Sequence, residues 1–382
     1  MTAITKENAA RILSDLIALP SVNPMGRPFT GTERVERRVA DYIENLFAPY
    51  GVPMERDPYS AMHENLLVTV PGRTNGPALL FESHMDTVPA DDWPDRAFEP
   101  RWEGDTLFGR GACDDKGPLV SMILATLAVL ESATPPPRPI LFLAAGDEEY
   151  NQTGILHFRD RNDSLAGGVF GEPTNCLPIV QHKGTIRWDI TVHGRSAHTS
   201  RPELGVNAIL GMMDVIHALK EHQCELQQRH TNPLLTGPLL TVSRIRGGRI
   251  RNAVPDECTI SVDFRILPGM ELKPSREEVI RRLAGLGHQI THHECQIMTP
   301  PLNTLPDDPF AQRVLAACRE VVGPQAQLSG EPYGTDAAWV TDRTPALVLG
   351  PGSIASAHAI DEHIDIAEVV RCAEIYRRIM VD

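Results

Sequence analysis

The sequence predicts an α/β fold: helices cover both faces of a mixed, largely parallel sheet, and a second, smaller domain is inserted into it. Short apolar runs bounded by Pro, Gly or charged residues alternate with segments of helical periodicity in the first 180 residues, and again after residue 301. Such alternation is typical of a parallel sheet covered by helices. At 382 residues, the chain is also long for a single core, which favours two domains.

The elements of the larger domain follow from the spacing of apolar residues. Helical spacing and short apolar runs distinguish its helices from its buried strands. The expected helices cover residues 8–19, 33–48, 119–130, 308–321 and 366–379. The expected strands cover residues 66–70, 78–81, 140–145 and 346–349, and a further strand ends at residues 169–170.

The pattern of the middle segment differs and predicts the order βαββαβ. Strands are expected at 186–192, 239–245, 259–266 and 290–295, and helices at 205–220 and 275–286. Ser275 is the expected N-cap of the second helix, with Glu278 three residues later. This order is that of a ferredoxin-like domain. We therefore expect one domain of residues 1–180 and 297–382, interrupted by an inserted domain of residues 181–296.

The composition excludes several classes of protein. A net charge of −14 argues against nucleic acid as a partner, because phosphate binding needs a basic face. The longest apolar stretch, residues 119–130, is too short to cross a membrane, and the first ten residues lack the apolar core of a secretory signal. Seven Cys without a CxxC pair are typical of reduced thiols. We expect a cytoplasmic protein without a membrane or nucleic-acid partner.

Side chains able to bind metal follow several of the expected strands. Because ligands of open α/β sheets bind beyond the carboxyl ends of the strands, we expect these side chains to converge. They are His84, Asp86, Asp114, Asp115, Glu148, Glu149, Glu172 and His358. A set of two His and three carboxylates suits zinc and its first-row neighbours better than magnesium or calcium.

Most of these residues also have a structural interpretation. His84 and Asp86 lie two apart in an extended segment and face the same way, so Asp86 could hold a ligating His84, or both could be a polar strand end. Asp114 and Asp115 precede a helix, and one could cap it while the other binds metal. Taken alone, His358 fits an ordinary loop histidine.

Glu148 and Glu149 are harder to explain structurally, because adjacent carboxylates repel unless cations are near. In a turning segment they point in different directions, so one could bind metal while the other acts as a base on substrate. A cysteine hydrolase using Cys113 and His84 would leave the carboxylates unexplained. A metal-binding protein without catalysis is a further alternative, although it would have no chemical need for Glu148.

Five stretches together resemble the M20 metallopeptidase and deacylase family. They are residues 83–89 (Ser-His-Met-Asp-Thr-Val-Pro), 109–117 (Gly-Arg-Gly-Ala-Cys-Asp-Asp-Lys-Gly), 147–149 (Asp-Glu-Glu), 171–174 (Gly-Glu-Pro-Thr) and 194–202 (Gly-Arg-Ser-Ala-His-Thr-Ser-Arg-Pro). The resemblance covers nearly the whole chain. It implies a zinc-peptidase-like catalytic domain and a dimerisation or lid domain inserted into it, in agreement with the βαββαβ order.

The resemblance also implies a role for each site residue. It implies two divalent metal ions per subunit, zinc or alternatively cobalt, with the ligands His84, Asp114, Glu149, Glu172 and His358. Asp114 would bridge the two ions; His84 and Glu172 would complete one, and Glu149 and His358 the other. Glu148 would be the general base, and Asp86 would orient His84. A cis peptide bond is implied between Asp114 and Asp115.

Within the family, the chain resembles the acetylornithine deacetylase subfamily, which implies hydrolysis of a small N-acyl amino acid. Segments at 171–173, 182–184, 205–209, 265–270 and 349–358 carry this similarity. Succinyl-diaminopimelate desuccinylase, and an aminoacylase or dipeptidase of the family, are the alternatives. Ile360 and the stretch 334–337 depart from the pattern near the expected substrate, so they bear on the choice of substrate and leave the metal ligands intact.

Three residues of the inserted domain complete the expected site. His198 would stabilise the oxyanion and, as the resemblance implies, would reach the site of the other subunit of a homodimer. Asn252 and Arg265 would bind the substrate carboxylate, since an Arg fork meets a carboxylate with two bonds. The structural alternative for His198 and Arg265 is a solvated surface residue.

Overall fold

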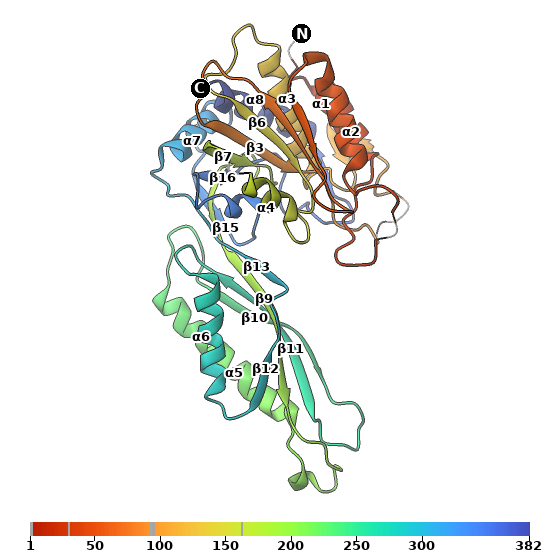
Figure 1. Cartoon of the computed structure of the whole chain (residues 1–382), viewed down its shortest axis with the longest axis vertical. Helices are drawn as coiled ribbons and strands as arrows, with labels where there is room; N and C mark the ends of the chain where they lie inside the picture. The colour runs from red at the N-terminus through yellow and green to blue at the C-terminus, as the bar shows by residue number, and fades with distance from the viewer. Residues whose placement is uncertain (1–2, 30, 92, 94–95, 162) are drawn as a thin grey trace. The chain divides into compact units, whose positions relative to one another are not determined.

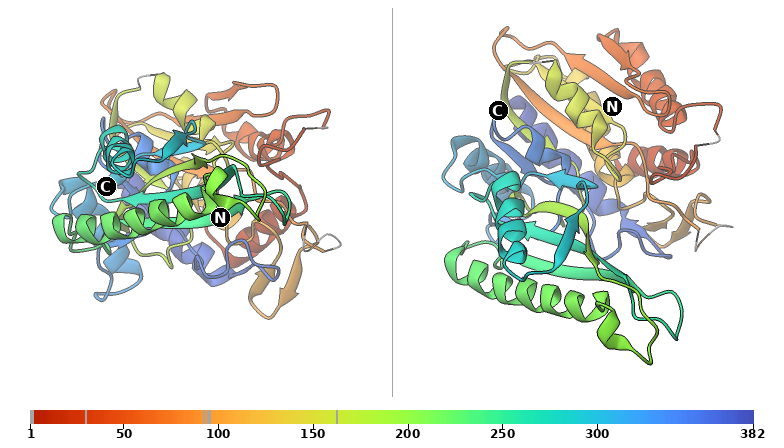
Figure 2. Two further views of the ribbon diagram at one scale, coloured as in Figure 1. Left: turned by 90° about the horizontal axis from the view of Figure 1, so that it is seen from below. Right: turned by 60° about the horizontal axis from the view of Figure 1, so that its bottom comes forward.

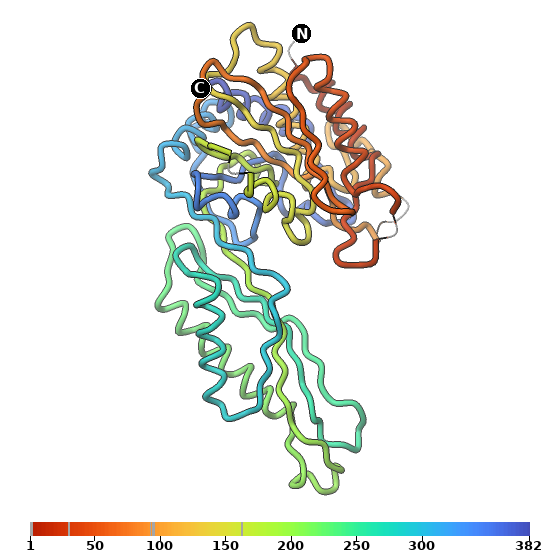
Figure 3. The backbone as a smooth tube through the Cα atoms, in the orientation of Figure 1, coloured from red at the N-terminus to blue at the C-terminus, as the bar shows by residue number. Residues whose placement is uncertain are grey.

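The computed structural model describes residues 3–29, 31–91, 93, 96–161 and 163–382, and it divides into two compact units (Figure 1). The first comprises Met1–Val180, Thr304–Ser329 and Thr335–Asp382, and the second comprises Gln181–Asn303 and Gly330–Gly334. The tube in Figure 3 follows the chain as it leaves the first unit after Val180 and re-enters it at Thr304.

The first unit is built on a mixed sheet whose central strands are parallel, as predicted. These are β6 (Ile140–Ala145), β3 (Ala78–His84), β7 (Leu165–Phe170) and β16 (Ala346–Val348), in that order. Antiparallel strands flank them: β1 (Met54–Asp57) and β2 (Asn65–Val70) on one side, and β8 (Ile179–His182) on the other. The central strands are buried on both faces, which explains their continuous apolar runs.

Helices cover this sheet on both faces. The helices α1 (Lys6–Ile17), α3 (Lys116–Leu130) and α8 (Ile366–Val381) pack together against one face, where Phe81 of β3 meets Tyr376 of α8 edge to face. α4 (Thr153–Asp160) and the short helix η3 (Asp336–Trp339) pack together on the other (Figure 1). The remaining helices of this unit are α2 (Arg37–Phe47), η1 (Ala48–Tyr50) and α7 (Pro309–Val321).

α3 begins three residues earlier than the sequence analysis predicts. Gly117 and Pro118 lie in its first turn, where the backbone N–H groups have no partner within the helix, so proline is tolerated there. Ser121 and Thr126 are buried in α3 and donate their hydroxyls to the carbonyls of Gly117 and Met122. A fully buried helix can therefore lead directly out of the Asp114–Asp115 segment.

The second unit has the predicted order βαββαβ. Its strands β9 (Gly184–His193), β10 (Leu239–Gly247), β11 (Glu257–Ile266) and β12 (Gln289–His292) form an antiparallel sheet in the order β10-β11-β9-β12. α5 (Ala208–Arg229) and α6 (Leu272–Ala284) pack on one face of it (Figures 1 and 2). This is the strand order of a ferredoxin-like fold.

The helix boundaries of the second unit correct two predictions. The N-cap of α6 is Glu271, so the prediction of Ser275 is wrong; Ser275 lies buried inside the helix. Pro274 sits in the first turn of α6, where it is tolerated and gives no stop signal. α5 begins after Asn207, whose side chain caps it, and it continues to Arg229, well beyond the expected end.

Short elements complete the structure. These are β4 (Arg101–Glu103), β5 (Thr106–Phe108), β13 (Ile297–Thr299), β14 (Leu302–Asn303), β15 (Ser329–Glu331), β17 (His363–Asp365) and η2 (Pro202–Leu204). Together with β1, β8, α4 and η3, they were not predicted, because segments of two to eight residues carry little periodicity. Among the described residues, no helix is long and apolar enough to cross a membrane.

Candidate metal centre

The parallel strands of the first unit place the predicted metal ligands at one edge of the sheet. His84 is the last residue of β3, and Glu148 and Glu149 follow the end of β6. Glu172 lies two residues beyond the end of β7. Since the carboxyl ends of parallel strands meet at the same edge, these side chains approach one another although they are far apart in sequence.

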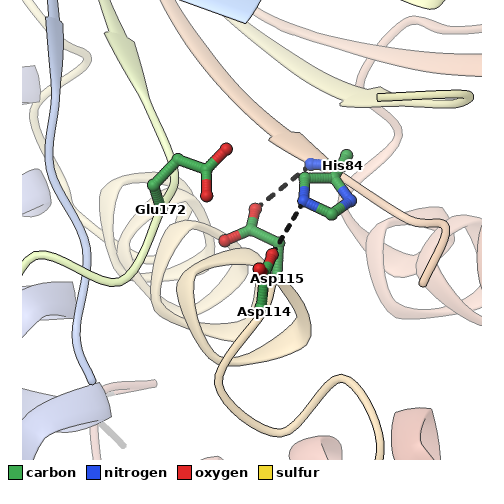
Figure 4. Close-up of side chains that lie close together, drawn as sticks. All are labelled: His84, Asp114, Asp115 and Glu172. Atoms are coloured by element: carbon green, nitrogen blue, oxygen red, sulfur yellow. Dashed lines mark hydrogen bonds and ion pairs between the residues drawn. The ribbon is translucent and has the colours of Figure 1, made fainter. Parts of the chain in front are cut away.

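Two overlapping groups of metal-binding side chains lie at this edge. The first consists of His84, Asp114, Asp115 and Glu172, and the second of Asp114, Glu149 and His358. Within each group, the ligand atoms all lie within 4.8 Å of one another. Figure 4 shows the first group, with side chains contributed by β3, by the segment before α3 and by the segment after β7. The structure thus brings all five predicted ligands together, and Asp114 belongs to both groups.

The spacing of these atoms fits metal ligation. Nε2 of His84 lies 3.1 Å from Oδ1 of Asp114, and Nε2 of His358 lies 3.2 Å from Oδ2 of the same carboxylate. His358 Nε2 is also 3.3 Å from Oε2 of Glu149. Ligands about 2.1 Å from a tetrahedral zinc ion are about 3.4 Å apart. The two oxygens of Asp114 face different histidines, as a carboxylate shared between two ions would.

Asp115 belongs to the first group as well, which the sequence analysis left open. Its Oδ2 accepts hydrogen bonds from the hydroxyl of Ser83 and from the backbone N–H of His84. Among the described residues, its side chain caps none of the first N–H groups of α3, and its Oδ1 has no hydrogen-bond partner. The peptide bond between Asp114 and Asp115 is cis, as expected. The hydrogen bonds from Ser83 and His84 hold the Asp115 carboxylate against the end of β3.

Asp86 contacts both His84 and the turn that follows β6. The ring N–H at Nδ1 of His84 donates to the backbone carbonyl of Asp86 at 2.9 Å, while the Asp86 carboxylate is 3.6 Å away. That carboxylate accepts the backbone N–H groups of Glu148 at 3.2 Å and Glu149 at 3.3 Å, and the amide of Asn23 at 2.9 Å. Asp86 therefore positions the two glutamates directly and His84 through its main chain.

The close approach of several carboxylates, together with their burial, shifts the pKa values of side chains in the site. Burial raises the pKa of Glu148 to about 8; His84 opposes this, and the neighbouring Glu149 adds to it. Hydrogen bonds to Asp114 and Glu149 raise the pKa of His358 to about 11. Burial, followed by the charge of Asp114, raises the pKa of Glu172 well above its usual range. Such a buried excess of carboxylates favours the binding of divalent cations, which would lower these pKa values.

The sequence analysis missed residues that support the site from behind. Asn23, buried, donates to the carboxylates of both Asp86 and Asp147 at 2.9 Å. Glu362 binds the segment that presents Asp114. Only the position of Glu362, four residues after His358, was available as a signal in the sequence. Asn23 lies in a Pro-flanked loop that resembles an ordinary turn.

The residues expected to bind substrate lie in the second unit, and they do not all lie together. His198 pairs with Ala253 across a short bridge, and the carbonyl of Asn252 accepts the N–H of Thr199, so His198 and Asn252 are neighbours on an exposed surface. Arg265 lies at the far end of β11, eight residues beyond Glu257, which corresponds to about 26 Å of strand. Its Nε donates to Asp263 at 2.8 Å.

Comparison with known proteins agrees with this site. Residues 80–382 match the family model described as Peptidase family M20/M25/M40. Acetylornithine deacetylase of Edwardsiella ictaluri (strain 93-146) is 32% identical over 365 residues, which cover 93% of this chain and 92% of that protein. Acetylornithine deacetylase of Pectobacterium atrosepticum is 29% identical over 376 residues, with 96% and 95% covered.

Solved structures share the fold over nearly their full length. The aminopeptidase PepT of Bacillus cereus ATCC 10987 has a TM-score of 0.80 at 21% identity, with 99% of this chain and 98% of that chain covered. The YXEP protein of Bacillus subtilis, described as a dinuclear metal binding peptidase from the M20 family, has a TM-score of 0.72 at 14% identity, with 98% and 97% covered. Given the matched family model and the relative at 32% identity, the chain belongs to peptidase family M20/M25/M40 and is a metal-dependent hydrolase.

Proposed function

We propose that the chain hydrolyses the amide bond of a small N-acyl amino acid, with N-acetylornithine as its substrate. The observation that carries the proposal is a half-buried carboxylate, Glu148, that belongs to neither group of ligands and is electrostatically coupled to members of both. Relatives that are named acetylornithine deacetylases, at 29–32% identity, support the choice of substrate.

Two divalent metal ions would be held by the overlapping groups that share Asp114. His84 and Glu172 would complete one site, and Glu149 and His358 the other, with Asp115 near the first. We propose zinc, with cobalt as the alternative, because a mixed set of imidazole and carboxylate ligands suits these ions. When bound, such ions polarise the substrate carbonyl and lower the pKa of water.

Glu148 would carry the proton through the reaction. Its carboxylate takes a proton from the attacking water as the water oxygen forms a bond to the acyl carbon. The same proton then passes to the amide nitrogen as the carbon–nitrogen bond breaks, and the second proton of the water passes from the new carboxylic acid to the amine, so that an ammonium and a carboxylate are released. Asp86 contributes by holding the N–H groups of Glu148 and Glu149, which fixes the direction in which each side chain points.

We further propose that the protein acts as a homodimer through the second unit. Six large apolar side chains of that unit are exposed: Leu204, Val206, Leu210, Met213, Ile245 and Ile250. We propose that they form one apolar surface. An exposed apolar surface of this kind is typical of an interface. His198 would then serve the site of the partner subunit, at the oxyanion, and Asn252 and Arg265 remain the residues proposed to bind the substrate carboxylate.

Two alternatives concern the substrate. A succinyl-diaminopimelate desuccinylase would use the same metal centre on a larger, doubly charged acyl group. An aminopeptidase or dipeptidase would need a pocket for a free α-amine, and the likeness to the aminopeptidase PepT keeps this alternative open. A metal-binding protein without catalysis would have no use for Glu148.

The test is steady-state hydrolysis of N-acetylornithine and N-succinyl-diaminopimelate, side by side, by protein loaded with zinc or with cobalt. We expect turnover of the acetyl compound, which would place the chain in arginine biosynthesis. Turnover of the succinyl compound alone would support the first alternative. If neither is hydrolysed, cleavage in a panel of dipeptides and tripeptides would support the second.

The matched control is Glu148→Gln, which keeps the size of the side chain and removes its ability to accept a proton. We expect it to bind both metal ions and to lose about 100- to 10,000-fold in kcat, the range that a general base contributes. A variant that retains most of its activity would contradict the proposed mechanism.

A further inference from the structure

Besides the contact of its backbone N–H with Asp86, Glu148 is bound through its side chain, at the end of a short chain of hydrogen-bonded side chains. Nε2 of Gln152 donates to Oε1 of Glu148 at 3.0 Å, and Oε1 of Gln152 accepts the indole N–H of Trp339 at 3.0 Å. Trp339 is the last residue of η3, 187 residues further along the chain. Both contacts lie within the first unit, and neither Gln152 nor Trp339 belongs to a ligand group.

Gln152 is held firmly in place by its backbone. It precedes α4 in a left-handed conformation, with φ 56° and ψ 32°, and it is 8% exposed. Its backbone N–H donates to the carbonyl of Asp147 at 2.7 Å, which closes the loop that also contains Glu148 and Glu149. The side chain of Gln152 is thus directed back over this loop onto Glu148.

Trp339 determines which end of the Gln152 amide faces Glu148. An indole nitrogen can only donate a hydrogen bond, so the amide oxygen must face Trp339. The amide NH₂ group must then face Glu148, and this group can only donate. Oε1 of Glu148 is therefore engaged by a donor, whereas Oε2 has no hydrogen bond from any described residue and is the oxygen left to accept a proton from water.

We infer that Gln152 is a positioning residue that selects Oε2 of Glu148 as the proton-accepting oxygen, and that Trp339 acts by fixing the orientation of the Gln152 amide. The inference rests on the proposed function, in which Glu148 is the general base. It assigns a role to two residues outside the metal ligands. A small displacement of a catalytic group lowers the rate strongly without changing how substrate binds, because reaction requires close alignment.

The first test is Gln152→Met in the metal-loaded protein, assayed with the N-acyl amino acid that the native protein hydrolyses fastest. Met has a similar length and no amide, and it keeps the backbone as constrained as Gln does. We expect kcat to fall about 10- to 100-fold, with KM within about twofold and with the same number of bound metal ions. Asn151→Ala, at the exposed neighbouring position, is the matched control and should behave as the native protein.

The second test is Trp339→Phe, which removes the indole N–H and leaves the loop unchanged. We expect a smaller fall in kcat than for Gln152→Met, again without a change in KM. In the Gln152→Met background, Trp339→Phe should have no further effect, because residues that act through one another are not additive. Trp102→Phe, at an exposed tryptophan of β4, is the control for loss of an indole.

The outcomes separate this inference from the proposed function. If Glu148→Gln is inactive while Gln152→Met has native kcat, only the inference is overturned. If Gln152→Met loses metal ions, Gln152 acts on the ligands, and the inference is again wrong. Independent, multiplicative effects of the two substitutions would overturn the role of Trp339. If Glu148→Gln is itself active, the proposed function fails, whatever Gln152 does.

Discussion

The carboxylate of Glu362 accepts a hydrogen bond from the backbone N–H of Asp114 at 3.0 Å, across 248 residues of sequence. The same oxygen accepts the N–H of Cys113 at 3.0 Å, and the other oxygen accepts the guanidinium of Arg110 at 2.6 Å. Glu362 and Arg110 are both buried. A single carboxylate near the C-terminus thus holds the segment that presents Asp114 to both groups of ligands.

We predict that Glu362→Ala lowers the free energy of unfolding by about 3–5 kcal/mol, because it leaves the charge of Arg110 buried without a partner. Urea denaturation of the metal-free protein measures this. Glu103→Ala removes the exposed partner of Arg101 and is the control, with an expected change of about 0–1 kcal/mol. Equal effects of the two substitutions would show that the buried pair of Glu362 and Arg110 contributes little.

The contact between Glu362 and Asp114 also shows where sequence analysis succeeds and where it fails. His84 and Glu149 could be predicted because they follow apolar strand runs, and the end of a parallel strand is a defined position in space. Glu362 lies in a loop, and two of its three partners are backbone N–H groups, which have no signature in sequence. The hydrogen bond between Trp339 and Gln152 could not be predicted from the sequence either. It depends on the left-handed backbone of Gln152, which precedes a helix that was not predicted.

The second prediction concerns the number of metal ions bound. Because Asp114 belongs to both groups of ligands, Asp114→Ala should abolish or severely weaken binding at both sites. His358→Ala should weaken one site only, because His358 belongs to the group that contains Glu149. The number of zinc ions per chain after dialysis, measured by elemental analysis, distinguishes the two. Equal loss in both variants would contradict the division into two groups that share Asp114.

The third prediction concerns pH. Without metal, burial raises the pKa of Glu148 from 4.5 to about 8. Ionising Glu148 is therefore harder in the folded protein than in the unfolded one, and the free energy of unfolding falls as the pH rises from about 5 to about 8. Hydrogen bonds to Asp114 and Glu149 raise the pKa of His358 from 6.5 to about 11, so its stabilising contribution is complete below pH 6.5 and is lost as the pH rises towards 11. Both shifts make the metal-free protein less stable as the pH rises.

Urea midpoints at pH 5.5, 7.0 and 8.5, with a chelator and with zinc, test this prediction. In the chelated protein, the midpoint should fall as the pH rises. The increase in urea midpoint on adding zinc should become larger from pH 5.5 to pH 8.5, because metal binding requires deprotonated ligands. A midpoint of the chelated protein that rises with pH would show that these two groups do not dominate its pH dependence.

The fourth prediction concerns Gly154, in the first turn of α4. A Cβ atom at this position would lie 2.2 Å from the carbonyl oxygen of Gly146, directly after β6. The N–H of Gly154 also donates to that oxygen at 3.1 Å, so the backbone cannot move away without losing the bond. We expect Gly154→Ala to lower the free energy of unfolding by about 1–3 kcal/mol, as overpacking does. Gly76→Ala, where a Cβ meets only Thr74 at 3.7 Å, is the control.

The last prediction concerns the apolar surface of the second unit. Leu210 and Met213 lie three residues apart on α5, and both are about 60% exposed, so Glu at either position is compatible with the folded subunit. If this surface joins two subunits, the double substitution Leu210→Glu and Met213→Glu would bury charge in the interface. We expect a monomer by light scattering, with both metal ions bound.

The same variant should lose activity, because His198 of each subunit could no longer reach the site of the other. Leu305→Glu is the control, since it introduces one of the two negative charges at an equally exposed apolar residue of the first unit. It should remain dimeric and active. A monomeric variant with native kcat would show that His198 is not supplied in trans, and a variant that remains dimeric would place the interface elsewhere.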